Sequence, residues 1–191
     1  MISTQKQFKI LTFAGSLRKA SYNKALVRAA IEVAPENVEM EVFDLEGIPP
    51  FNQDLEKTPP EKVKEFKEKI RSADALLIAT PEYNYSIPGV LKNALDWASR
   101  PYQDNALASK PVAIMSASTG LFGGARAQYH LRQSFVRLDM YPINLPEVML
   151  PSAAQNVDAN GNLTNQQTKT LIKQLIEALV AWTNTLNCKP Q

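Results

Sequence analysis

A short apolar run that ends in a loop of hydrogen-bonding groups constrains the fold of this chain more than any other feature. Residues 75–79 carry no polar side chain, which is typical of a strand covered on both faces in a parallel sheet. After the loop 80–87, Pro88 suits a first helical turn, and apolar residues recur at helical spacing over 91–98. The loop therefore joins a strand's carboxyl end to a helix's amino end, where ligands bind in open α/β sheets.

The loop offers two aromatic rings among polar groups. Tyr83 and Tyr85 supply ring faces, while Glu82, Asn84 and the backbone suit the edge of a flat heterocycle. Residues 80–89 alone fit equally well an ordinary turn with two surface tyrosines, although binding residues favour such loops. A second loop of this kind at the same edge of the sheet is needed to decide between a binding site and an ordinary turn.

Strands and helices alternate along the whole chain. We expect strands at residues 8–14, 38–43, 75–79, 112–115 and 142–148. Helices are expected at about residues 23–34, 58–71, 88–100 and 125–140, and from residue 164 through at least residue 180. This alternation predicts an α/β fold in which a five-stranded parallel sheet has helices on both faces.

Three local features carry further expectations. Thr58-Pro59-Pro60-Glu61 has the spacing of a capping box, and Thr164 with Gln167 has the same spacing. The irregular stretch 45–57 is expected to form a wall of the site.

Composition narrows the class of protein. The 191 residues carry a net charge of +2 without a block of like charges, which predicts neither a nucleic-acid nor a membrane partner. The length favours one domain over residues 1–191. The apolar runs are too short for a membrane span or a signal peptide, so a cytoplasmic protein is the default expectation. Cys188 and His130 are each alone, which predicts no metal site, an incidental thiol and a structural histidine.

The loop after the first strand has the groups that bind phosphate. Residues 15–23 precede a helix, whose amino-terminal N–H groups favour an anion. Ser16, Ser21 and Asn23 add short polar side chains, and Arg18 adds a charged donor. A polar turn with a capped helix remains the alternative.

The same loop lacks two known nucleotide motifs. It holds one glycine, so neither G-x-G-x-x-G nor a P-loop is present. Residues 116–124 form a third loop that is small and rich in glycine, so its backbone can approach a ligand closely. A mononucleotide fits these loops better than a dinucleotide or ATP. The pattern favours FMN in a flavodoxin-like sheet with strand order 2-1-3-4-5.

Three motifs resemble those of the NADPH-dependent FMN reductase family, and its quinone and chromate reductases are the most similar members. They are Gly-Ser-Leu-Arg-Lys-Ala-Ser-Tyr-Asn at 15–23, Pro-Glu-Tyr-Asn-Tyr-Ser-Ile-Pro-Gly at 81–89, and Gly-Gly-Ala-Arg at 123–126. The resemblance runs from about Phe8 to Leu150 in the same order.

The resemblance implies a cofactor site for FMN. It assigns the phosphate and ribityl chain to Ser16, Leu17, Arg18, Ser21, Tyr22 and Asn23. It assigns the isoalloxazine to Pro81, Glu82, Tyr83 and Asn84, and the ring edge to Ala117 and Ser118. Alanine at 117 departs from the hydroxyl residue expected there, so only a backbone contact is assigned to it.

The resemblance also implies the reaction, in which NADPH or NADH reduces FMN and FMN reduces small acceptors such as quinones, free flavin or chromate. The cofactors carry this chemistry, so we expect no catalytic side chain and a ping-pong cycle. A flavoprotein azoreductase, a flavodoxin-type electron carrier and a flavin-binding partner protein without turnover remain alternatives. The slightly basic charge disfavours the carrier, because flavodoxins are strongly acidic.

We also expect a homodimer or homotetramer. Val90 and Trp97 lie a heptad apart, on a helix face that a monomer is expected to leave wet. Arg126 and Tyr129 stand one turn apart and are expected to meet Glu147 of another subunit.

Overall fold

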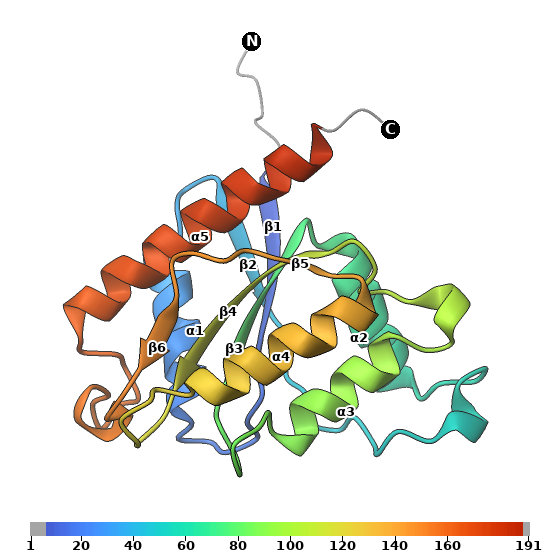
Figure 1. The fold of residues 1–191 in the computed structure, drawn as a ribbon, viewed down its shortest axis with the longest axis horizontal. Coiled ribbons are helices and arrows are strands. Elements are labelled where there is room, and N and C mark those ends of the chain that lie inside the picture. Colours follow the sequence, from blue (N-terminus) through green and yellow to red (C-terminus); the bar gives the residue numbers. More distant parts are fainter. Residues whose placement is uncertain (1–6, 189–191) are drawn as a thin grey trace.

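The computed structural model describes residues 7–188 and has a parallel sheet at its centre (Figure 1). The strands are β1 (Phe8–Ala14), β2 (Val38–Val42), β3 (Ala75–Thr80), β4 (Pro111–Ala117), β5 (Tyr141–Pro142) and β6 (Val148–Leu150). The helices are α1 (Tyr22–Val33), α2 (Glu61–Ser72), α3 (Gly89–Ala98), α4 (Ala125–Leu138) and α5 (Gln166–Asn187). The strand order β2-β1-β3-β4-β5 confirms the predicted flavodoxin-like topology.

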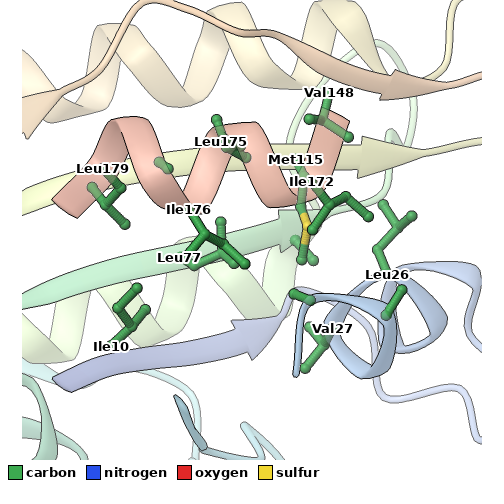
Figure 2. Close-up of a cluster of buried hydrophobic side chains, with 14 of the residues drawn as sticks. Ile10, Leu26, Val27, Leu77, Met115, Val148, Ile172, Leu175, Ile176 and Leu179 are labelled. Carbon is green, nitrogen blue, oxygen red and sulfur yellow. The ribbon is translucent and has the colours of Figure 1, made fainter. Parts of the chain in front are cut away.

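Both faces of the sheet are covered. On one face, Ile10 and Leu77 pack against α1 and α5, and Figure 2 shows Ile172, Ile176 and Leu179 of α5 lying over these strands. On the other face, strand residues such as Leu76 pack against α2, α3 and α4. Because successive strand residues face opposite sides, a sheet buried on both faces needs the largely apolar runs of β1, β3 and β4.

The predicted fifth strand is two short strands. β5 and β6 both pair in parallel with β4, and the ladder is interrupted between them. Pro142 and Pro146 have no N–H to donate, so a continuous ladder over 142–148 is not available. The prediction of one strand at 142–148 was therefore wrong, although both pieces occupy the expected edge.

Both predicted capping boxes were wrong. Helix α2 begins at Glu61 after Pro60, and no side chain caps it. Pro60 disfavours a helical conformation at Pro59, so the helix starts only after both prolines. Helix α5 begins at Gln166 with Asn165 as its cap, and the Asn165 side chain accepts from the Thr168 amide at 2.9 Å. Asparagine ranks above threonine at this position.

The irregular stretch after β2 covers helix α3. The Trp97 indole N–H donates to the Pro49 carbonyl at 2.8 Å, and the Phe51 ring meets the Trp97 ring edge-on at 5.0 Å. Asn93 also bonds Pro49 and Phe51. Trp97 is only 1% exposed and Val90 is partly buried, so most of the helix face on which we based the oligomer prediction is not wet. The chain itself covers that face.

Lys67 of α2 is a buried cation with a partner on the surface. Its side chain is 3% exposed, and its ammonium lies 2.5 Å from both the Asp104 carboxylate and the Arg100 carbonyl. Arg71 also bonds Asp104. The hydrogen bond from Lys67 lowers the pKa of Asp104 below its ordinary value, and the nearby charges of Lys67 and Arg71 lower it further. This pair fastens α2 to the segment after α3.

We predict that Asp104→Asn lowers the free energy of unfolding by about 1 kcal/mol, since the carboxylate is half exposed and screened. The pKa of Asp104 is lower in the folded protein than in the unfolded chain, where it is about 3.9. The ionised carboxylate therefore stabilises the fold above about pH 3.9, and this stabilisation is lost as the pH falls through the pKa of the folded state. Urea unfolding at about pH 7 should therefore separate variant from wild type, and the gap should close in acid. Glu68→Gln, on the exposed side of α2, is the control. An equal gap at all pH values would contradict the assignment.

Candidate functional site

A cleft of about 270 Å³ opens at the carboxyl ends of β1, β3 and β4. It is lined by Ser16, Arg18, Ser21, Tyr22, Asn23, Pro81, Glu82, Tyr83, Ala117, Ser118 and Thr119. The three loops identified from the sequence thus meet in one cavity. Of the predicted site residues, Leu17 and Asn84 do not line it, while Thr119 was not predicted. Residues 45–57 do not line it either, so their predicted role as a wall was wrong.

The amino terminus of α1 forms one end of the cleft. Ser21 is the helix cap, and its hydroxyl accepts from the Lys24 amide at 3.4 Å. The amides of Tyr22 and Asn23 belong to the first helical turn, where N–H groups have no intrahelical acceptor and suit an anion. The Arg18 guanidinium lies 4.8 Å from the centre of the Tyr22 ring. Arg18 joins none of the ion pairs formed among residues 7–188, so its charge is left for a ligand.

Asn23 holds two sides of the cleft together. Its side-chain amide donates to the Ala117 carbonyl at 3.0 Å, and its side-chain oxygen accepts from the Ala117 amide at 3.0 Å. Both residues are buried, and they are 94 positions apart in the sequence. The polar groups predicted to contact a ligand here are already paired with each other. We therefore assign Asn23 and Ala117 to shaping the cleft.

We predict that Asn23→Ala lowers the free energy of unfolding by about 2 kcal/mol in the flavin-free protein, because a buried amide and carbonyl lose their partners. Asn184→Ala on the exposed surface of α5 is the matched control, and it should be neutral or slightly stabilising. Urea unfolding measures both variants. An Asn23→Ala protein that is as stable as wild type without flavin, and weaker only in flavin binding, would show a ligand role instead.

The Glu82 carboxylate holds the start of α4. It accepts from the Arg126 side chain at 2.6 Å, the Arg126 amide at 3.1 Å and the Ala127 amide at 3.4 Å. A carboxylate at a helix amino terminus is favoured by the helix dipole. The Glu82 side chain is therefore engaged within the chain, and its backbone is what remains for a ligand. Arg126 likewise has a partner in its own chain, which the predicted contact with another subunit did not anticipate.

The mouth of the cleft is a tight turn in an uncommon conformation. Tyr83 and Ser86 exchange backbone hydrogen bonds of 2.9 and 3.0 Å, and φ is positive at Asn84 (50°) and Tyr85 (67°). This pattern is a type I′ turn, which suits asparagine but strains tyrosine. The Arg126 guanidinium lies 3.8 Å from the centre of the Tyr85 ring, and this contact favours the strained turn. Tyr85 is 67% exposed and lies outside the cleft lining.

His130 belongs to this mouth. Its Nδ1 lies 3.0 Å from the Ser86 hydroxyl, and the ring is exposed on α4. The structural role predicted for this histidine fits the contact, but its partner, which is 44 positions away, could not be predicted from the sequence.

Gly124 lets α4 begin close to β4. Its φ is 91°, and a Cβ atom there would lie 2.8 Å from the Cβ of Ser116. The Ser116 hydroxyl donates to the Gly123 carbonyl at 2.6 Å and accepts from the Gln128 side chain at 2.8 Å. The Ser118 hydroxyl accepts from the Gly120 amide at 3.2 Å, which bends the loop over the cleft. Thr119 is exposed at this bend.

No group of three or more His, Cys, Asp or Glu side chains among residues 7–188 could hold a metal ion. None of the helices in this range is both long enough and apolar enough to span a membrane.

Residues 8–155 match the family described as NADPH-dependent FMN reductase. The chain belongs to this family. A relative from Pseudomonas aeruginosa, named NAD(P)H-dependent FMN reductase, is 51% identical over 179 residues, which cover 93% of this chain and 96% of the relative. The NADPH:quinone oxidoreductase of Arabidopsis thaliana is 46% identical over 188 residues, with 95% and 94% covered.

A solved structure agrees with these sequences. The flavoenzyme NAD(P)H:(acceptor) oxidoreductase of Paracoccus denitrificans superposes with a TM-score of 0.85 at 34% identity, covering 93% of this chain and 98% of that one. The cofactor predicted from the loops is therefore the cofactor of the family.

Proposed function

We propose that this protein is an FMN-dependent NAD(P)H reductase of quinones and related small acceptors. The observation that carries the proposal is the single cleft formed by three strand-end loops, with helix amides and Arg18 at one end and Tyr83 at the mouth. A phosphate suits the first end and a flat ring suits the second. The names of the relatives support the coenzyme and the acceptor class.

The residues present fit FMN. Arg18, Ser16 and the first amides of α1 would hold the phosphate, and Ser21 and Tyr22 would flank it. Pro81, the Glu82 backbone and Tyr83 would face the ring from one loop, and Ser118 and Thr119 from the other. FMN would supply the chemistry, accepting a hydride from the nicotinamide and passing electrons to the acceptor.

The protein's own part in the reaction is to bind and orient. Asn23 fixes the distance between the loops at 15–23 and 117–119, because it bonds Ala117 at both of its side-chain atoms. Glu82 and Arg126 fix the mouth turn to α4. Tyr83 gives an exposed ring at the entrance, where a flat quinone or nicotinamide can stack. No side chain needs to move a proton in this scheme.

We predict that Arg18→Ala weakens FMN binding by about 1.5 to 3 kcal/mol, the range for a hydrogen bond to a charged group. Riboflavin lacks the phosphate, so its affinity should not change. Titration of the flavin-free protein with each ligand measures the effect, and Arg132→Ala, outside the cleft lining, is the matched control. Equal losses for the two flavins would show that Arg18 does not meet the phosphate.

We predict that NADPH reduces a simple benzoquinone with parallel double-reciprocal lines, because both substrates use the same open side of the flavin. Steady-state rates over a grid of the two concentrations test this. Intersecting lines would contradict the shared position. A protein that takes electrons only from another protein would instead be a carrier.

We propose that two copies of the chain associate, at least as a dimer, around the mouth. Leu121 is 83% exposed and Phe122 is 64% exposed, and Tyr83, Tyr85 and Tyr129 are exposed as well. The rings of Phe122 and Tyr85 both lie against the Arg126 guanidinium. Exposed apolar groups gathered in this way usually mark a contact, and two-fold pairing is the commonest solution. Tyr129 and the exposed Glu147 stay in the proposal as a polar contact between copies.

We predict a mass of at least twice 21.2 kDa by light scattering at micromolar concentration, and a lower mass for the double variant Leu121→Ser, Phe122→Ser. Tyr129→Phe and Glu147→Gln test the polar contact separately. A monomeric wild type with flavin bound would refute association.

Three expectations stay predictions from the sequence, namely a cytoplasmic location, the lack of nucleic-acid or membrane partners, and reduction of chromate.

A further inference from the structure

A second cavity adjoins the phosphate end of the cleft. It measures about 650 Å³, within the range of about 300 to 1,000 Å³ that small-molecule pockets span. Arg18, Ser21 and Tyr22 line both cavities, so the second begins where the proposed phosphate site ends. Its far wall is the segment 154–161, between β6 and α5.

One side of this cavity is positively charged. Arg18, Lys19 and Arg28 line it, and Asp158 is the acid among its lining residues. The Asp158 carboxylate accepts from the Asn162 amide at 2.7 Å and from its side chain at 3.3 Å, so it is held within its own turn. Arg28 donates to the Gly161 carbonyl and fixes the wall. The net charge favours an anion beside Arg18 and Lys19.

The far wall carries small apolar side chains beside the polar Asp158 and Asn160. Ala154 and Ala159 are exposed there, and Val157 is partly buried and packs against the core. A cationic end next to a shallow apolar surface suits a ligand that joins a phosphate to a flat ring. An adenylate group has both parts.

We propose that this cavity receives the adenylate half of FAD, so that the protein binds the flavin dinucleotide as well as FMN. The proposal rests on the proposed function, because it requires the flavin phosphate at the start of α1. In FAD the adenylate is joined through a phosphoanhydride to the phosphate that FMN carries. A flavin seated in the cleft therefore delivers the adenylate past Arg18 and into the second cavity. The second phosphate meets Lys19, and the adenine lies over Ala154 and Ala159.

Titration of the flavin-free, full-length protein with riboflavin, FMN and FAD tests the proposal through quenching of flavin fluorescence. Lys19→Gln removes a charge from the second cavity, and Ala159→Trp fills it; neither residue lines the cleft. Lys57→Gln, an exposed lysine outside both cavities, is the matched control. Chromatography of the released ligand verifies that the bound FAD is intact.

We expect FAD to bind wild type, about threefold more weakly to Lys19→Gln and at least about tenfold more weakly to Ala159→Trp, with FMN affinity unchanged. The proposal would be overturned if the protein bound FMN but not FAD. It would also be overturned if both variants bound FAD as tightly as wild type does. A raised KM for NADPH in the two variants, with unchanged FAD affinity, would also overturn it, because the cavity would then bind the nicotinamide coenzyme. If FMN and riboflavin also failed to bind, the proposed function itself would be contradicted.

Discussion

The reciprocal hydrogen bonds between Asn23 and Ala117 are the interaction on which the rest of the site depends. They join the start of α1 to the end of β4, although β3 lies between β1 and β4 in the sheet. A helix amino terminus can bind a phosphate wherever it occurs, but a mononucleotide also needs its ring site at a fixed distance. This pair sets that distance from within the protein, before any ligand arrives.

The polar residues of the site divide into two groups with different tasks. One group forms hydrogen bonds with other parts of the chain and holds the three loops in place; it consists of Asn23, Glu82 and Ser116. The other group faces the cleft and remains for contact with a ligand; it consists of Arg18, Tyr83 and the first backbone amides of α1. Such a division suits a flavin enzyme, in which the protein binds and orients while the cofactor carries the reaction.

The sequence predicted the fold well because burial on both faces leaves a direct mark on each central strand. The runs at β1, β3 and β4 were found for that reason, and the strand ends then located the three loops. Two local predictions failed where prolines occur. They are the capping box before α2, at Pro59 and Pro60, and the single strand over residues 142–148.

The hydrogen-bonding and packing partners of these side chains could not be predicted from the sequence. Asn23 and Glu82 line the cleft, but their bonding partners lie 94 and 44 positions away. No spacing rule covers such distances. The same limit applies to Trp97, whose helix spacing suggested an exposed face while a loop more than 40 positions earlier covers it. Periodicity predicts that a residue is apolar on a given face, but it does not identify the segment that packs there.

The visible absorption spectrum of the purified protein, recorded without oxygen before and after adding NADPH, tests the central claim most directly. We expect a yellow protein with one flavin per chain, whose absorption bleaches on NADPH alone and returns when a quinone is added. A colourless protein that takes up no FMN, or a yellow one that NADPH does not bleach without a second protein, would contradict it.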